Sequence, residues 1–509
     1  MQKTIRHRFW SAVLVTVAAS SLLQLPATAG ETMLKLLRVL KEKGSITETE
    51  YQMLVTAAQE ESGAKSAPTA PSPVAATPAP AIATSPVTAT ATAAQAAAKT
   101  EGKVSTAAAD KREAMHAKTD GTSSVNDAVA KALKGKWYER ISFRGYAQLR
   151  YTHIIDEDGA ALNVLNDASA STTSSFLLRR GRVILSGDAT DRLFVYAQAD
   201  FNASLSSGET ALGMRDYYGD FAFDDKKEFR VRFGQSKVPF GWVNMQSSQN
   251  RAPMERADAL NSAVEGERDI GAFFYWAPEE VRHRFRDLVK LGLKGSGDYG
   301  VVGVGAYSGQ GLNRLDLNGE PHAVARVTYP WKLDSGQYFE TGIQAYHGKF
   351  LSPVSSMTYN GATFTPTRPA DGVVDERVGL SFVWYPQPFG IEAEWNIGRG
   401  PELDPVRRTL ERETLHGGYV QIAYRIQQHL GDWYPFVRWQ YFDGARKFAA
   451  NAPQLKVNEV DFGIEWQPRP EFELTVSYSH TFERNNTRVA PYLETESADR
   501  IAFQAQLNF

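Results

Sequence analysis

Residues 501–509 read Ile-Ala-Phe-Gln-Ala-Gln-Leu-Asn-Phe and end the printed sequence. Apolar side chains stand at every second position from Ile501 to Phe509, with small or polar residues between them. A period of two predicts a β-strand with one apolar face. An exposed terminal Phe gains nothing from water, so a soluble sheet seldom ends on one. The alternative is an edge strand of a soluble sandwich.

The same alternation recurs along most of the chain. Residues 141–152 and 193–202 place Ile, Phe, Leu and Val on one face and Arg, Gln and Asp on the other. One face suits lipid and the other suits water. A soluble up-and-down barrel is the alternative, and it would bury these charged residues in its core. We therefore predict an all-β fold, a transmembrane antiparallel β-barrel over residues 137–509. Its last strand resembles the closing strand of bacterial outer-membrane barrels, in which Phe509 would be read by the barrel-assembly machinery.

Seventeen alternating runs can be counted, whereas a bacterial single-chain barrel closes with an even number of strands. Runs 267–277 and 288–296, joined by a bulky charged connection, are expected to form one interrupted strand or an embellished turn, which gives 16 strands. The runs are 141–152, 176–187, 193–202, 214–223, 228–235, 267–277, 288–296, 299–308, 321–332, 337–347, 375–385, 388–398, 416–428, 432–442, 456–467, 471–482 and 498–509.

The composition excludes several other classes of protein. The chain of 509 residues is 42% hydrophobic but has no apolar run long enough for a polytopic helical membrane protein. It contains no Cys, so disulfide and thiolate chemistry are absent. Its 21 Tyr, 26 Phe and 10 Trp can supply the aromatic girdles of a membrane barrel. The net charge of -2 gives no reason to expect nucleic-acid binding.

Residues 1–29 have the features of a secretory signal peptide. A basic start and an apolar stretch precede Ala27-Thr28-Ala29, so cleavage is expected before Gly30. The apolar stretch is too short to anchor the chain in a membrane comfortably, and no Cys follows it for lipoprotein attachment. We expect export and insertion into the bacterial outer membrane.

Residues 30–61 are expected to form a helical hairpin on the periplasmic side. Gly44 supplies the stop of the first helix, and Thr47 and Glu50 form a capping box for the second. So small a module buries little core alone, so it is expected to associate with its counterparts or with another envelope component, or else to plug the barrel. Residues 62–136 form an Ala/Pro/Thr-rich linker and a polar segment, and the linker composition favours disorder.

Long and short connections alternate between the runs, as a meander of antiparallel strands requires. Short connections such as 224–227 and 386–388 are expected to face the periplasm. The longer connections, expected to be extracellular loops, are 155–174, 203–213, 236–266, 309–320, 348–374, 400–415, 443–455 and 483–497.

Arginines gather on two early runs. Arg179, Arg180 and Arg182 occupy three of four successive positions, and Arg230 and Arg232 share one face of a later run. Guanidinium groups stay charged and form bidentate hydrogen bonds with carboxylate or phosphate oxygens, so an arginine-lined lumen favours anions. The alternative is that these arginines lie in an interface girdle or pair with aspartates of neighbouring strands. The candidate aspartates are Asp200, Asp216 and Asp220.

The loop 236–266 is long enough to fold back into a wide barrel and to narrow its lumen. It carries both apolar anchors and cations, so we expect it to form the constriction. The anchors are Phe240, Trp242 and Met254, and the cations are Lys237, Arg251 and Arg256.

Five motifs are similar to those of the phosphate-selective porin O and P family. They are Arg179-Arg180-Gly181-Arg182, the run from Phe233 to Gly241, Glu255-Arg256, Arg268-Asp269-Ile270-Gly271 and the run from Tyr307 to Gly311. The resemblance covers about residues 143–509. It implies a 16-stranded, trimeric outer-membrane channel for anions whose third loop forms the eyelet. It also implies that Arg179 and Arg180 are eyelet arginines and that Arg256 is a loop charge.

Some positions depart from this pattern. Tyr146, Asn244 and Gln249 stand where the resemblance leads us to expect cations, and Glu392 and Glu394 bring acids to the polar face of a later run. A lumen that holds both signs of charge weakens the expectation of phosphate selectivity. We therefore expect an anion-preferring porin for small solutes such as phosphate, with no cofactor and no metal.

An enzyme and an envelope tether are the alternative functions. An enzyme would need a histidine near a nucleophile or a carboxylate cluster, and the histidines of the barrel region are scattered, so no catalysis is expected. An envelope tether would use the N-terminal module to bind a periplasmic or cell-wall partner and the barrel as an anchor. The histidines are His153, His283, His322, His347, His416, His429 and His480.

Overall fold

The computed structural model describes the barrel region almost completely. The described residues are 140–158, 175–203, 210–486 and 493–509, together with Arg38, Lys41, Glu48, Tyr51, Gln52 and Val55. The chain divides into two units, Met1–Ser105 and Thr106–Phe509. The predicted signal peptide and linker lie outside the described residues.

The six described residues of the first unit are all helical. Lys41 forms an ion pair with Glu48 at 2.6 Å, and its ammonium group lies 4.7 Å from the ring centroid of Tyr51. These contacts join the two segments that were predicted as helices. The remaining residues of the hairpin lie outside the described part of the chain, so the hairpin stays a prediction.

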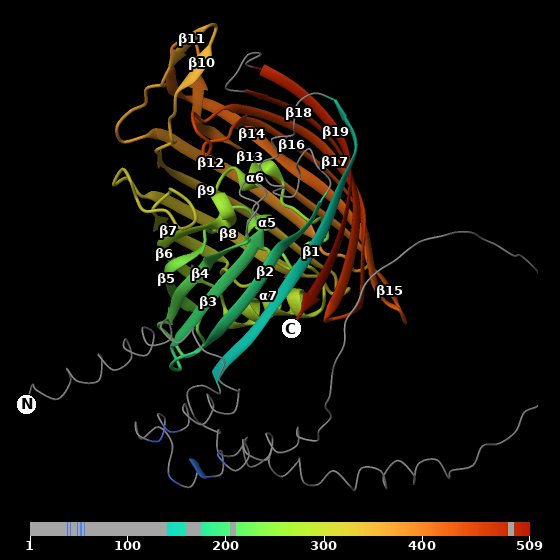
Figure 1. The fold of residues 1–509 in the computed structure, drawn as a ribbon. Helices are drawn as coiled ribbons and strands as arrows, with labels where there is room; N and C mark the ends of the chain where they lie inside the picture. The colour runs from blue at the N-terminus through green and yellow to red at the C-terminus, as the bar shows by residue number, and fades with distance from the viewer. Residues whose placement is uncertain are drawn as a thin grey trace, which may run out of the picture. The chain divides into compact units, whose positions relative to one another are not determined.

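The second unit forms a closed antiparallel barrel of 16 strands, as predicted (Figure 1). β1 pairs with both β2 and β19, which closes the ring. β14 and the short β15 both pair with β16, so these two segments share one place in the ring. The strands are β1 Ile141–Asp158, β2 Ser175–Asp188, β3 Leu193–Ala203, β4 Thr210–Ala222, β5 Phe229–Lys237, β6 Arg268–Trp276, β7 Val302–Tyr307, β8 His322–Lys332, β9 Tyr338–Phe350, β12 Val373–Trp384, β13 Phe389–Asp404, β14 Thr409–Tyr424, β15 Ile426–Gln428, β16 Gly431–Ala445, β17 Gln454–Arg469, β18 Phe472–Asn486 and β19 Leu493–Asn508.

The barrel is apolar outside and polar inside. On β1, Phe143 and Leu149 are 63% and 51% exposed, whereas Gln148 and Arg150 are each 1% exposed. This is the reverse of a soluble barrel, and it is the arrangement that lipid outside and a polar lumen inside require. No helix in the described part of the chain is long and apolar enough to cross a membrane.

A β-bulge on β2 turns two adjacent arginines into the lumen. Gln148 of β1 pairs with Arg180, but the next residue, Leu149, pairs with Leu178, so Arg179 is an extra residue on β2. A bulge of this kind interrupts the alternation of faces. Arg179 and Arg180 are therefore both buried inside the barrel, although strict alternation would have put one of them on the lipid face.

The structure corrects three of the predicted segments. The run 288–296 is not a strand. Helix α7, Glu279–Lys290, and an irregular segment connect β6 to β7, so the embellished turn was the right alternative. Residues 400–415 are not mainly a loop, because β13 and β14 continue as a hairpin up to Asp404 and from Thr409. The predicted loop 483–497 is likewise mostly strand, because β18 continues to Asn486 and β19 begins at Leu493. A small hairpin of β10, Met357–Tyr359, and β11, Ala362–Phe364, lies within loop 348–374.

Phe509 closes the barrel against Gly145. The two residues exchange backbone hydrogen bonds, from Gly145 N to Phe509 O at 2.7 Å and from Phe509 N to Gly145 O at 3.0 Å. A Cβ atom at Gly145 would lie 2.5 Å from the Phe509 ring and 2.4 Å from the carbonyl oxygen of Arg182. The seam therefore requires a residue without a side chain at position 145.

Candidate functional site

The segment Val238–Glu267, here called the inserted loop, folds into the lumen between β5 and β6. It contains three short helices, α5 Trp242–Met245, α6 Asp258–Asn261 and the 3-10 turn Glu265–Glu267. Its entry turns at Gly241, whose φ of 83° favours glycine. Because the loop contacts several strands of the wall, it narrows the lumen as the sequence predicted.

Acidic and apolar residues hold the entry of the inserted loop against one side of the barrel. Glu394 of β13 accepts hydrogen bonds from the backbone N–H groups of Trp242 and Val243 at 2.5 and 2.7 Å. The indole Nε1 of Trp242 donates to Glu340 of β9 at 3.2 Å. Glu394 thus faces the lumen, as predicted, and its role there is to bind the loop.

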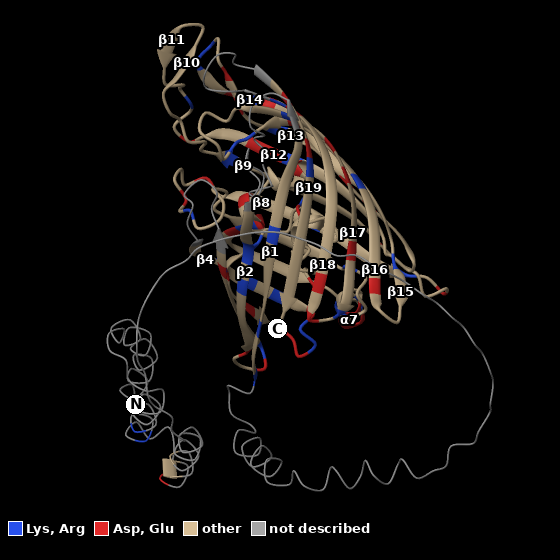
Figure 2. Cartoon of the chain, turned by 45° about the vertical axis from the view of Figure 1, so that its right-hand side comes forward, with Lys and Arg blue, Asp and Glu red and all other residues tan. Residues whose placement is uncertain are grey.

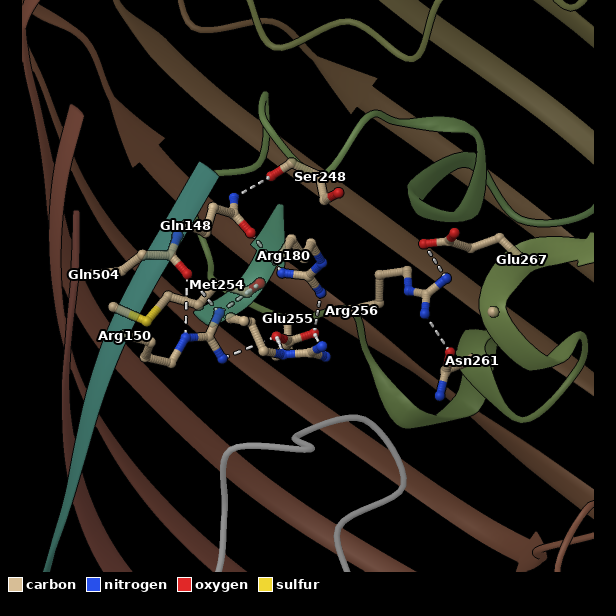
Figure 3. Close-up of polar contacts among 12 residues, drawn as sticks. Gln148, Arg150, Arg180, Ser248, Met254, Glu255, Arg256, Asn261, Glu267 and Gln504 are labelled. Carbon is tan, nitrogen blue, oxygen red and sulfur yellow. Dashed lines mark hydrogen bonds and ion pairs between the residues drawn. The ribbon is translucent and has the colours of Figure 1, made fainter. Parts of the chain in front are cut away.

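Three arginines of the opposite wall converge on Glu255 of the inserted loop (Figure 3). Arg150 Nη1 lies 2.9 Å from Oε1, Arg179 Nε lies 2.8 Å from Oε1, and Arg180 Nη2 lies 2.7 Å from Oε2. Gln148 accepts a further hydrogen bond from Arg180 at 2.9 Å. Two of the predicted anion-binding arginines, Arg179 and Arg180, therefore pair with a carboxylate of the chain itself.

Most of the other predicted cations also have partners inside the protein. Arg182 bonds Asp200 at 3.1 Å, Arg230 bonds Asp298 at 2.8 Å, and Arg232 bonds both oxygens of Asp220 at 2.6 and 2.8 Å. Arg182 and Arg232 thus pair with acids that the alternative named. Arg230 pairs mainly with Asp298, which lies beyond α7 and was not among those acids, and it approaches Asp220 only to 4.0 Å. Lys237 donates to the carbonyl oxygens of Met245 and Gln246, and Arg256 bonds Asn261 and forms an ion pair with Glu267.

Arg251 differs from the other predicted cations. Its side chain is buried at 4% exposure, and none of its three guanidinium nitrogens has a hydrogen-bond partner among the described residues. Burial, and next to it the positive charge of Arg180, lowers the pKa of Arg251 well below its usual range, and the nearby carboxylate of Glu255 offsets this only in part. The charged form is therefore costly here unless an anion accompanies it.

Cavities lie on both sides of Arg251 along the inserted loop. Residues 253–256 line a narrow cavity of about 40 Å³ against β1 and β16–β19, enough for very few water molecules. Gln249 and Asn250 line a wider cavity of about 550 Å³ that reaches the end of the barrel at which the C-terminus lies. In sequence, Arg251 lies between the residues that line the two cavities.

The walls of the narrow cavity carry both signs of charge. Arg438 pairs with Asp461 at 2.6 Å, and Arg500 pairs with Glu459 at 2.7 Å. These pairs partly compensate the charge of the lumen. Figure 2 shows that basic and acidic positions both occur along the strands of the barrel. Among the described residues, no group of three or more His, Asp or Glu side chains could hold a metal ion.

Sequence reasoning missed several residues of this site. Arg150, Arg438 and Arg500 lie on polar faces of runs that were recognised, so the alternation alone could have assigned them to the lumen. Glu255 was noted only as part of a motif, and nothing in its sequence position indicated three arginine partners. Tyr146, which replaces an expected cation, bonds Ser248 at 2.6 Å and Arg182 at 2.7 Å, so it joins the wall to the loop.

A closed barrel with a loop folded into a charged lumen defines the class of the outer-membrane porins. The chain belongs to the phosphate-selective porin O and P family, whose model matches residues 155–509. The family is one of porins, which are channels. No curated protein matches the chain.

Solved structures of outer-membrane proteins are similar to the chain at low identity. The outer membrane channel DcaP of Acinetobacter baumannii is 14% identical, with a TM-score of 0.44, over 72% of this chain and 97% of that chain. The anion-selective porin from Comamonas acidovorans is 9% identical, with a TM-score of 0.42, over 72% and 99%. OmpT of Vibrio cholerae in its trimer form is 11% identical, with a TM-score of 0.43, over 72% and 99%.

Proposed function

We propose that the protein is a water-filled outer-membrane channel that prefers small anions such as phosphate, with the inserted loop as its constriction. The observation that carries this proposal is Arg251, a buried cation whose guanidinium has no hydrogen-bond partner among the described residues. Because Arg251 lies in sequence between the residues that line the narrow and the wide cavity, an anion that passes from one cavity to the other would come near this guanidinium. The paired arginines would contribute a positive field, and Arg251 would contribute the direct contact.

The test compares R251Q with R256Q in planar bilayers. Both substitutions remove one positive charge from the inserted loop, but Arg256 already pairs with Glu267. An ion pair at about 4 Å and an effective dielectric near 20 contributes about 4 kcal/mol before desolvation costs. Loss of about 1.4 kcal/mol of this interaction energy already lowers the affinity for an anion tenfold. We expect R251Q to lower chloride selectivity and to weaken phosphate block of the chloride current at least tenfold, and R256Q to do so much less. Equal effects of the two variants, or a wild-type channel without anion preference, would contradict the proposal.

For the whole protein we propose a homotrimer in the outer membrane, assembled through recognition of Phe509 by the barrel-assembly machinery. The family membership supports the outer-membrane channel, and the closing contact between Phe509 and Gly145 supports the importance of the last residue. Cross-linking of the purified protein and its mass in detergent test the trimer. A monomer at all concentrations would contradict it.

We further propose that the N-terminal module, residues 30–61, lies in the periplasm and that residues 62–136 connect it to the barrel. The helical conformation of its described residues and the contacts of Lys41 support a folded module. Deletion of residues 31–98 should leave conductance unchanged. If conductance is lost, the module is part of the channel; if it is kept but envelope attachment is lost, the module acts as a tether.

A further inference from the structure

Helix α7 and the inner wall formed by β2–β5 enclose a cavity of about 600 Å³. It lies at the end of the barrel at which α7 and the C-terminus are found (Figures 1 and 2). It is here called the platform cavity, and its described lining residues are separate from those of the narrow and the wide cavity along the inserted loop. Its volume is within the range of sites that bind small molecules.

A row of aromatic rings faces the lumen in this part of the wall. Tyr196 of β3 pairs with Tyr218 of β4, and their rings stack at a centroid distance of 5.1 Å. Phe194 continues the row at 6.5 Å from the Tyr196 ring, near the start of β3. Phe194 and Tyr218 line the platform cavity and are both partly exposed. An apolar ring that faces water inside a channel is unfavourable, so this row is suited to a solute whose apolar face covers it.

Ion pairs line the same cavity. Arg232 donates to both oxygens of Asp220 at 2.6 and 2.8 Å. Arg230 and Arg282 donate to Asp298, each at 2.8 Å. A hydroxyl group accepts from a guanidinium and donates to a carboxylate, so one hydroxyl can bind both members of such a pair. The cavity thus offers hydrogen-bond donors and acceptors side by side.

Arg230 also carries a donor without a partner. Its side chain is 6% exposed and lines the cavity, and its Nε atom has no hydrogen-bond partner among the described residues. A buried donor of this kind costs free energy until an acceptor reaches it. The acceptor need not be charged, because Asp298 already forms an ion pair with Arg230 at 2.8 Å. An oxygen atom of a neutral solute therefore suffices.

The platform cavity is less suited to a small anion. Six of its cations each pair with a carboxylate, and the seventh, Arg286, forms a hydrogen bond with Nδ1 of His283. An anion would lose its hydration and lie close to the paired carboxylates, whereas a neutral solute does not incur this cost. The six pairs are Arg192–Asp225, Lys226–Glu279, Lys227–Asp188, Arg230–Asp298, Arg232–Asp220 and Arg282–Asp298.

We propose that the platform cavity is a binding site for neutral saccharides, so that the channel admits small sugars as well as anions. The C–H face of a pyranose ring would stack on Phe194, and its hydroxyl groups would bind Arg230, Asp220 and Asp298. This site does not depend on the anion preference proposed above, because its ligand is uncharged and Arg251 is not among its lining residues.

The first test measures block of the ion current by maltose, a neutral disaccharide, in planar bilayers. Maltose added on the side of α7 should block the wild-type current saturably. Polyethylene glycol of similar mass, which lacks a ring face and a row of hydroxyl groups, should lower the current only through viscosity. We expect F194A to raise the half-blocking concentration about fivefold or more, and F194Y, which keeps the ring, to stay within about twofold of wild type. Equal block of wild type by the two solutes, or equal block of F194A and F194Y by maltose, would overturn the proposal.

A second pair of variants keeps the net charge constant. D220N/R232Q removes one ion pair from the platform cavity, and the control R425Q/D432N removes one from the wider cavity. D220N/R232Q should weaken maltose block about fivefold or more, and the control should leave it near the wild-type value. Both variants should keep the wild-type reversal potential, because each loses one positive and one negative charge. Equal effects of the two variants on maltose block would overturn the assignment of the site.

Protection of single thiols locates the site, since the chain contains no Cys. H283C places a thiol on the α7 side of the platform cavity, and K290C places one in the wider cavity. Saturating maltose should slow modification of H283C by an uncharged methanethiosulfonate reagent about fivefold or more, and modification of K290C should be unchanged. If inorganic phosphate protects H283C and maltose does not, the platform cavity is an anion site and the proposal is wrong.

Discussion

The Nη2 atom of Arg180 on β2 lies 2.7 Å from Oε2 of Glu255 in the inserted loop. This contact, repeated by Arg150 and Arg179, fastens the loop to the arginine-rich wall, while Glu394 fastens its entry to β13. The arginines that suggested an anion site are thus largely used to position the constriction. Under the proposed function, direct contact with a solute is instead assigned to Arg251, whose guanidinium has no hydrogen-bond partner among the described residues.

Replacement of Glu255 by Gln should loosen the inserted loop. Three buried guanidinium groups would lose their carboxylate, and loss of one partner of a buried ion pair costs about 3–5 kcal/mol. We expect E255Q to raise single-channel conductance and open-channel noise without loss of the barrel. D225N is the matched control, because its pair with Arg192 is mostly exposed and such pairs contribute little. A quiet channel of unchanged conductance in E255Q would show that the loop is held by other contacts.

The contact of Glu255 with the arginines should persist in mild acid. Burial opposes ionisation of Glu255, but Arg179, Arg180 and Arg150 outweigh it and hold its pKa well below its usual range. A carboxylate with a lowered pKa keeps its stabilising contribution above its ordinary range and loses it only as the pH falls through the lowered value. Conductance and noise of the wild-type channel should therefore stay constant between about pH 7 and pH 5. A transition within that interval that is absent from E255Q would contradict this assignment.

Position 145 should tolerate no side chain. A Cβ atom there would meet the Phe509 ring and the Arg182 carbonyl oxygen well inside contact distance, whereas a Cβ at Gly213 of β4 would meet nothing within 4 Å. We expect G145A to reduce the fraction of heat-modifiable, folded barrel and G145V to reduce it further, with G213A close to wild type. Equal yields of G145V and G213A would show that the seam can open without loss of the fold.

Deletion of Phe509 should impair closure. The deletion removes two backbone hydrogen bonds with Gly145, and each contributes about 1 kcal/mol net. It also removes a ring that contacts Phe143 at a centroid distance of 6.3 Å. The appropriate control is F233A, which removes an exposed aromatic ring of the barrel exterior on β5, a strand that pairs with β4 and β6 and not with β1 or β19. Assembly of the deletion variant at the level of F233A would count against a special role for the last residue.

The alternation of residues predicted the strands, their number and the inward direction of most charges, because each of these depends on neighbours in sequence. It could not reveal the bulge at Arg179, since a single extra residue leaves the composition of the run unchanged. The run 288–296 was counted among the alternating runs because Leu288, Leu291 and Leu293 fit both a short strand and the end of a helix. The contact of Glu255 with Arg180 spans 75 positions and depends on the path of the loop, which no local pattern records.

The segment Leu291–Ser296, which follows α7 and contacts β14–β17, affects the order in which the molecule is built. Leu291 and Lys294 bind residues that lie 134 and 171 positions later in the chain. These partners are in place only after β14–β17 have joined the sheet, and closure of such long segments is entropically costly before other contacts support it. We therefore expect the segment Leu291–Ser296 to dock late, so that the mouth of a nascent barrel is wider than that of the finished one. A protein trapped before that point would leak solutes of any charge, so the docking of this segment on β14–β17 would contribute to the permeability barrier of the membrane as well as to the fold.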